Sequence, residues 1–130
     1  MKKAKFTGSA QIFLVKDVLK AADYYRDKMG FDCTLLGEPV QFCIAGRDNH
    51  HLMLAQSGDP EHSPASTKVI PDMWDAYFWV DDIEGLYVEL DQREVIIDYG
   101  LKIANYGVKE FGIKDLDGYE IAFGQIVKSS

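Results

Sequence analysis

Hydrophobic residues recur at helical spacing in two stretches of the chain, residues 18–29 and 83–90. The apolar members of the first stretch are Val18, Ala21, Ala22, Tyr25 and Met29. The second stretch repeats the first four of these steps. Each follows a short run rich in aromatic and β-branched residues, at 11–15 and 76–80, which favours a strand. The pattern therefore predicts a strand followed by an amphipathic helix, twice.

Polar residues and glycine mark where these helices begin and end. Asp17 and Asp82 stand directly before the two helices, where an aspartate side chain accepts hydrogen bonds from free backbone N–H groups. Gly30 follows the first helix, at a position that needs a positive φ. Three more strands are expected in each half, at 31–36, 39–45 and 50–55 and at 95–103, 107–114 and 119–125. The turn pairs Asp48-Asn49 and Asp117-Gly118 separate the last two strands of each half.

The two halves also match each other in sequence. Residues 13–18 align without gaps with 78–83, and residues 42–56 align with 111–125. Because both matches run in the same order, the chain is predicted to be a duplication of one βαβββ unit, which gives an α+β fold.

This repeat sets the expected domain organisation. We expect one domain over residues 1–130, with a first module at about 9–56 and a second at about 73–126. The polar, proline-containing segment 57–72 is the expected linker between them.

Composition narrows the choice of partners. The 130 residues carry a net charge of −7, which argues against nucleic acid as a partner, since its recognition normally shows a basic footprint. An acidic surface suits a cationic ligand, although acidity also serves solubility alone. No apolar run is long enough to span a bilayer, and no apolar signal core follows Met1. We therefore expect a cytoplasmic protein with no membrane partner.

The closing segment carries a motif. Residues 106–123 read YGVKEFGIKDLDGYEIAF, similar to the pattern W-G-x-x-E-F-x-x-x-D-P-D-G-x-x-x-x-F, and residues 15–31 are similar to V-x-D…F-Y…L-G-F. On these motifs the chain resembles the glyoxalase/bleomycin-resistance/extradiol dioxygenase (vicinal oxygen chelate) superfamily, in particular its bleomycin-resistance-like members. Tyr106 stands for the usual Trp and Leu116 for the usual Pro, and neither change disturbs the hairpin.

The resemblance implies two βαβββ modules that form a cupped mixed sheet around a central cavity, usually in a homodimer. That cavity holds either a divalent metal or an organic ligand. The family's metal ligands come from four equivalent places, which here read Ala10, Met53, Asp75 and Ala122. Alanine offers no donor and a thioether is a poor ligand for such ions, so we expect no metal and no cofactor.

A shift in this alignment would bring Gln11 and Glu120 into the candidate positions instead. We expect such a shift to turn these side chains to the opposite face of the sheet.

Side chains alternate between the two faces of a strand, so residues an even number of positions from the family's metal-ligand positions are expected to face the cavity. They are Ile12, Leu14, Tyr77 and Trp79, beside Asp75. Aromatic rings with a carboxylate suit a flat or cationic organic molecule, although Tyr77 and Trp79 would also fill a closed core. Further candidates at the rim are Trp74, Tyr106 and Glu110, the last at the family's E-F position, where its role is structural or ligand-contacting.

Two classes of function follow. The favoured one is a metal-free protein that binds and sequesters a small organic ligand, with no catalytic residues, because the sequence holds no recognisable nucleophile–base set or phosphate loop. The alternative is a glyoxalase-like lyase or isomerase, or a dioxygenase, with an atypical metal site. A regulatory module with a vestigial pocket is a third reading.

Overall fold

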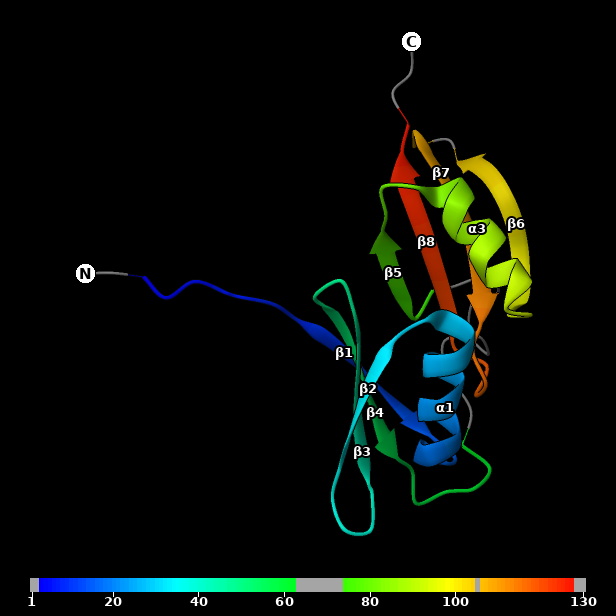
Figure 1. Ribbon diagram of the computed structural model, residues 1–130. Helices are drawn as coiled ribbons and strands as arrows, with labels where there is room; N and C mark the ends of the chain where they lie inside the picture. Colours follow the sequence, from blue (N-terminus) through cyan, green and yellow to red (C-terminus); the bar gives the residue numbers. More distant parts are fainter. Residues whose placement is uncertain (1–2, 63–73, 105, 128–130) are drawn as a thin grey trace. The chain divides into compact units, whose positions relative to one another are not determined.

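The computed structural model describes residues 3–62, 74–104 and 106–127. The chain divides into two compact units, Met1–His62 and Ser63–Ser130. Figure 1 shows each unit as strands with one labelled helix. The predicted linker falls mostly on residues 63–72, which lie outside the described residues. No helix in the described ranges is long and apolar enough to cross a membrane.

The first unit is a four-stranded mixed sheet with one helix. In chain order its elements are β1 (Ala10–Val15), α1 (Val18–Met29), β2 (Asp32–Leu36), β3 (Phe42–Arg47) and β4 (His50–Gln56). The strands lie in the order β1-β4-β3-β2. The edge strand β1 is parallel to its neighbour β4, whereas the pairs β4–β3 and β3–β2 are antiparallel.

The second unit repeats this order. Its elements are β5 (Ala76–Trp79), α3 (Ile83–Gln92), β6 (Ile96–Ala104), β7 (Val108–Lys114) and β8 (Glu120–Ile126). The sheet order is β5-β8-β7-β6, with β5 parallel to β8. The predicted α+β class and the tandem βαβββ order are therefore confirmed. The central cavity and the homodimer stay predictions.

One predicted strand begins in the wrong place. The third strand of the first half was expected at 39–45, but β3 begins at Phe42. Residues 37–40 form a turn instead, and the Gln41 N–H closes it with a hydrogen bond of 3.1 Å to the Leu36 carbonyl. Gly37 takes φ 102° there, and Pro39 has no N–H to give to a strand ladder. These two residues explain the later start.

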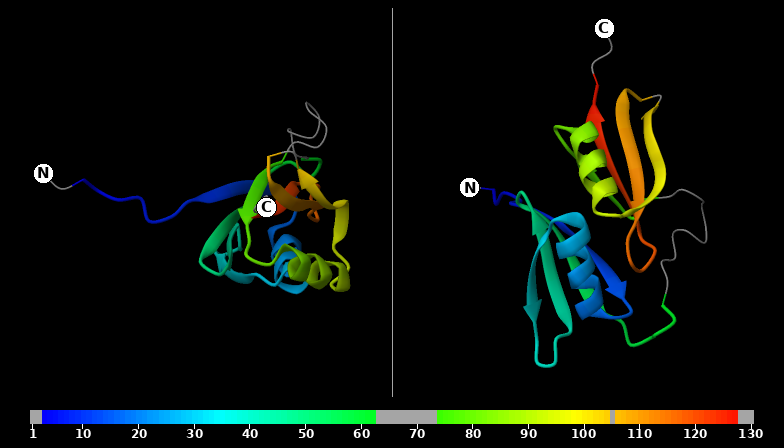
Figure 2. Two further views of the ribbon diagram at one scale, coloured as in Figure 1. Left: turned by 90° about the horizontal axis from the view of Figure 1, so that it is seen from above. Right: turned by 45° about the vertical axis from the view of Figure 1, so that its right-hand side comes forward.

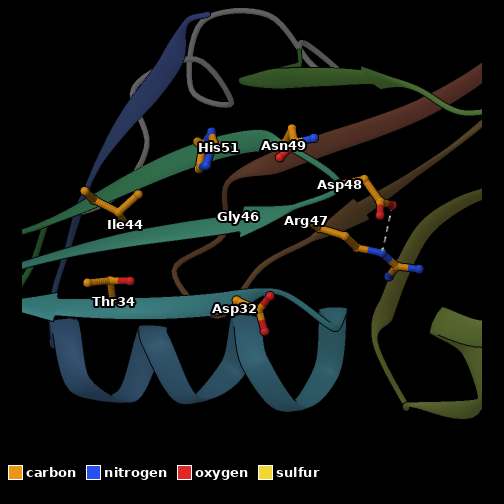
Figure 3. A pocket seen from close by; sticks show the side chains of 8 residues that line it. All are labelled: Asp32, Thr34, Ile44, Gly46, Arg47, Asp48, Asn49 and His51. Atoms are coloured by element: carbon orange, nitrogen blue, oxygen red, sulfur yellow. Dashed lines mark ion pairs between the residues drawn. The ribbon is translucent and has the colours of Figure 1, made fainter.

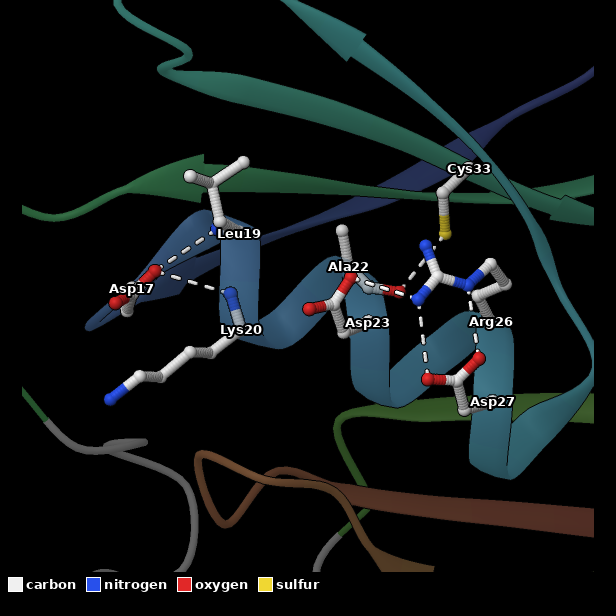
Figure 4. Close-up of polar contacts among 8 residues, drawn as sticks. All are labelled: Asp17, Leu19, Lys20, Ala22, Asp23, Arg26, Asp27 and Cys33. Carbon is white, nitrogen blue, oxygen red and sulfur yellow. Dashed lines mark hydrogen bonds and ion pairs between the residues drawn. The ribbon is translucent and has the colours of Figure 1, made fainter.

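The helix ends follow the predicted capping. The Asp17 side chain accepts hydrogen bonds of 3.1 Å from the backbone N–H groups of Leu19 and Lys20 (Figure 4). Asp82 accepts in the same way from Gly85 at 3.0 Å. Gly30 ends α1 with φ 73°, a conformation that glycine adopts without strain. Local sequence is therefore enough to fix where each helix starts.

Each helix covers one face of its own sheet (Figure 2). In the first unit Phe13 and Val15 on β1 and Tyr25 on α1 are buried. In the second unit the ring of Tyr87 on α3 meets Phe111 edge-on, with centroids 5.1 Å apart. Fully burying an apolar side chain of this size contributes about 1.5–3 kcal/mol, so these buried faces stabilise each unit.

In each unit a glutamine near the end of the last strand binds the turn between the first strand and the helix. The Gln56 carbonyl accepts from Val18 N at 2.9 Å, and its amide donates to Lys16 O at 2.7 Å. Gln125 repeats both bonds, with Ile83 N at 3.0 Å and Asp81 O at 2.7 Å. The pairing of these glutamines in the sequence repeat thus reflects one structural role.

We predict that Gln125→Met lowers the free energy of unfolding by about 1–3 kcal/mol, because two backbone groups lose their partner. Urea unfolding followed by circular dichroism measures this. Gln92→Met, at the exposed end of α3, is the matched control and should stay within about 0.5 kcal/mol of the parent. Equal stabilities of the two variants would contradict the assigned role.

Candidate functional site

The second sheet has one face against α3 and one face away from it. Successive strand residues point to opposite faces, so the contact of Phe111 with α3 places Glu110 and Gly112 on the other face. The strand register sets Glu110 opposite Gly124, and Tyr77 opposite Ala122. We call this second side the open face.

A buried carboxylate lies at its centre. Glu110 is only 1% exposed, and from the described residues it accepts three hydrogen bonds. Tyr77 donates to Oε1 at 3.2 Å, Tyr99 donates to Oε2 at 2.8 Å, and Tyr106 donates to Oε1. Hydrogen bonds to a carboxylate are stronger than neutral ones, so these donors offset the cost of burying the charge.

Two tryptophans extend the ring system. Trp74 donates its indole N–H to the Tyr99 hydroxyl at 2.9 Å. The ring centroids of Trp74 and Tyr77 are 4.8 Å apart, and those of Tyr77 and Trp79 are 4.9 Å apart, with planes inclined at 61° and 57°. We call the set Trp74, Tyr77, Trp79, Tyr99, Tyr106 and Glu110 the Glu110 cluster.

Glycines in the inner strands make room for these rings. A Cβ at Gly124 would overlap the Tyr77 hydroxyl, and a Cβ at Gly112 would overlap the Tyr99 ring. Neither glycine has a positive φ, so what is required here is space, not backbone freedom. The close approach lets both tyrosines reach Glu110 from the outer strands.

Irregular pairing brings Tyr99 to this face. The β6–β7 register shifts between Ile97 and Tyr99 and again between Tyr99 and Lys102. With regular pairing Asp98 would stand opposite Gly112, whereas the extra residue places Tyr99 there. Regular strand alternation would therefore not place Tyr99 on this face.

A second buried carboxylate lies beside the cluster. Glu120 is 1% exposed, and its Oε2 lies so close to Gly112 that a Cβ there would be 2.7 Å away. It therefore shares the open face with Ala122, and the expectation that it points to the opposite face is wrong. The reason is simple: residues 120 and 122 are two apart and keep the same parity.

The structure gathers five of the predicted ligand-binding residues in the Glu110 cluster: Trp74, Tyr77, Trp79, Tyr106 and Glu110. The predicted site residue Asp75 instead contacts the backbone: its Oδ2 accepts a hydrogen bond from the Glu120 N–H at 2.9 Å. Ile12 and Leu14 belong to the first unit, where they are exposed on the face of the sheet opposite buried Phe13 and Val15.

Comparison with known proteins agrees with this architecture. Residues 9–123 match the sequence model of the glyoxalase/bleomycin resistance protein/dioxygenase superfamily. The chain belongs to this superfamily. A search of curated proteins gave no match.

Solved structures share the fold of this superfamily member at low sequence identity. A glyoxalase-related enzyme from Clostridium phytofermentans has a TM-score of 0.75 at 11% identity, covering 98% of this chain and 100% of its own. TioX from Micromonospora sp. ML1 has a TM-score of 0.72 at 16% identity, with coverages of 94% and 100%. Lactoylglutathione lyase from Agrobacterium tumefaciens has a TM-score of 0.69 at 17% identity, covering 95% of this chain and 96% of its own. Such identities show the fold alone.

The metal that the superfamily implies does not fit the equivalent residues of this member. Ala10 and Ala122 have no donor atoms, Met53 has a thioether, and the Asp75 carboxylate accepts from the backbone. A catalytic divalent site needs about three nitrogen, oxygen or thiolate ligands. In the described part of the chain no group of three or more His, Cys, Asp or Glu side chains could hold a metal.

A polar hollow of about 440 Å³ opens in the first unit (Figure 3). Its lining comes from β2, β3, β4 and the turn 48–49, and includes Asp32, Thr34, Ile44 and His51. The His51 ring lies over Gly46, so that a Cβ there would meet it at 2.7 Å. At the rim Arg47 donates to the Met29 carbonyl at 2.8 Å, so part of the polar lining serves the fold.

The buried carboxylate also changes the acidity of the tyrosines. Burial, followed by hydrogen bonding to and repulsion from Glu110, raises the pKa of Tyr106 to about 12. Burial and the Glu110 charge raise the pKa of Tyr77, and burial and the hydrogen bond to Glu110 raise the pKa of Tyr99. All three are therefore neutral donors across the physiological range.

We predict that Gly124→Ala destabilises the protein by about 1–3 kcal/mol, because the new methyl group forces the Tyr77 hydroxyl off Glu110. Thermal and urea unfolding measure the change. Gly100→Ala is the control, since its Cβ would meet only the Tyr87 hydroxyl at an ordinary 3.4 Å. A harmless Gly124→Ala would show that the close approach is not needed.

Alkaline titration tests the carboxylate's effect on the tyrosines. Since these folded-state pKa values are raised above the ordinary value of about 10, the stability they contribute is present below about pH 10 and is lost at higher pH. We expect late-ionising tyrosines in the absorbance at 295 nm. Glu110→Gln should move their ionisation to lower pH, and an unchanged curve would exclude Glu110 as the cause.

Proposed function

We propose that this protein binds a small aromatic or cationic organic molecule on the open face of the second unit and performs no chemistry on it. The observation that carries the proposal is the Glu110 cluster, in which exposed rings stand beside a buried carboxylate. Trp79 is 61% exposed, Tyr106 54% and Trp74 37%, so these rings have surface to offer a ligand.

Hydrogen bonds within the cluster hold its rings in place. The hydrogen bonds of Tyr77, Tyr99 and Tyr106 to Glu110, with that of Trp74 to Tyr99, fix the directions of four rings. Ordering a flexible side chain on binding costs about 0.5–1.5 kcal/mol, a cost that fixed rings avoid. Preorganised aromatic surface favours a role in binding.

The polar groups of the cluster are poorly placed for catalysis. A general acid or base works best with a pKa near the operating pH, whereas the pKa values of the three tyrosines are raised away from it. The oxygens of Glu110 already accept hydrogen bonds from these tyrosines. Both features support sequestration over turnover. The lyase, isomerase or dioxygenase alternative has no observation of its own in the described residues.

Other parts of the proposal rest on the family resemblance. They are a bleomycin-resistance-like role, a homodimer and residence in the cytoplasm. Ile12 and Leu14 stay proposed ligand contacts because they are exposed apolar side chains on one face of the first sheet. Light scattering during size-exclusion chromatography measures the oligomeric state, and a monomer at all concentrations would remove the dimer from the proposal.

The protein's two tryptophans both belong to the Glu110 cluster, so intrinsic fluorescence reports this surface directly. We predict that cationic and aromatic compounds change the tryptophan fluorescence in a saturable way and raise the melting temperature. Trp79→Ala should weaken binding at least tenfold. Val88→Ala, an exposed apolar residue on α3, should leave binding unchanged. A broad panel without any saturable ligand would reject the proposed function.

A further inference from the structure

The Glu110 carboxylate carries charge but has little capacity left for hydrogen bonds. A carboxylate offers about four acceptor positions, and tyrosine hydroxyls occupy three of them. Since Glu110 is 1% exposed, a ligand N–H would have to displace one of these hydroxyls to reach it. The charge itself still acts through space on anything that lies on the rings.

Other polar atoms of the cluster also point inward. The Trp74 N–H is directed to the Tyr99 hydroxyl, and the Tyr77 hydroxyl lies against Gly124. Tyr106 is 54% exposed and its hydroxyl donates to Glu110, which leaves its oxygen as a single acceptor. A primary ammonium group has three N–H donors that water satisfies, and one phenol oxygen replaces too few of those bonds.

The rings themselves are suited to a cation. Tryptophan and tyrosine faces attract positive charge, and donating to an anion polarises a phenol so that its ring becomes more electron-rich. The structure contains an internal example, because Lys102 Nζ lies 4.5 Å from the centroid of the Tyr99 ring. The net charge of −7 favours the approach of cations in general.

We propose that the open face selects organic cations whose charge carries no N–H groups, of the quaternary ammonium class, over primary ammonium ions of similar shape. This inference rests on the proposed function and specifies its ligand class. A quaternary ammonium keeps its charge when it leaves water for the rings and abandons no hydrogen bond. The buried carboxylate then supplies attraction without requiring a donor.

Three probes test this selection by tryptophan fluorescence and calorimetry: benzyltrimethylammonium, benzylammonium and benzyl alcohol. We expect benzyltrimethylammonium to bind about tenfold more tightly than benzylammonium, the effect of one or two unsatisfied donors. Benzyl alcohol should bind weakest, because it lacks charge. Equal or tighter binding of benzylammonium would overturn the inference while leaving the proposed function intact. No response to these probes from a protein that binds other compounds would also overturn it, and no response to any compound rejects both.

Variants separate charge from general packing. Lys102→Gln removes the cation that competes for the Tyr99 ring, so benzyltrimethylammonium should bind about twofold to fivefold more tightly. Lys109→Gln makes the same change in net charge. Because Lys109 pairs with Glu84 of the helix α3, away from the open face, this variant should alter binding less. Glu110→Gln, with its fold verified by circular dichroism, should weaken binding of the quaternary ion more than binding of benzyl alcohol. Equal effects of the two lysine variants would contradict the claim that the cationic probe binds on the open face.

Discussion

Burial of the Glu110 charge is the constraint on which the open face of the second unit depends. A carboxylate taken out of water is costly unless donors replace the lost hydration, and three tyrosine hydroxyls do so here. These donors come from β5, β6 and the turn before β7, so one charge holds together segments that are distant in sequence. Burial together with these bonds raises the pKa of each tyrosine and keeps it neutral, and the bonds also direct the rings.

The surrounding backbone accommodates this arrangement. Glycines at 112 and 124 leave space for Tyr99 and Tyr77 close to β7 and β8, and the irregular pairing of β6 turns Tyr99 inward. These are local departures from a regular sheet. They gather beside a cluster in which aromatic rings and a buried carboxylate meet, as departures from regularity often do near functional surfaces.

The duplicated units share a framework but differ on the face opposite the helix. Gln56 and Gln125 make the same pair of hydrogen bonds, and both helices begin with a capping aspartate. In contrast, the positions of Ile12 and Leu14 are taken by Tyr77 and Trp79 in the second unit. Duplication therefore preserves the bonds that define the fold and leaves the sheet face free to vary. That freedom is consistent with the identities of only 11–17% between this chain and the three solved structures that share its fold.

The sequence by itself determined the repeated βαβββ order, the helix caps and the absence of ligands at the family's metal positions, because these depend on local periodicity, capping and residue type. It also pointed to Tyr77, Trp79, Tyr106 and Glu110 through strand parity and one motif. Only the tertiary structure decided that a single carboxylate receives three tyrosines and that Tyr99 belongs to the cluster. Strand pairing brings these groups together across long sequence separations, and a shift of register reverses side-chain direction without leaving a local signal.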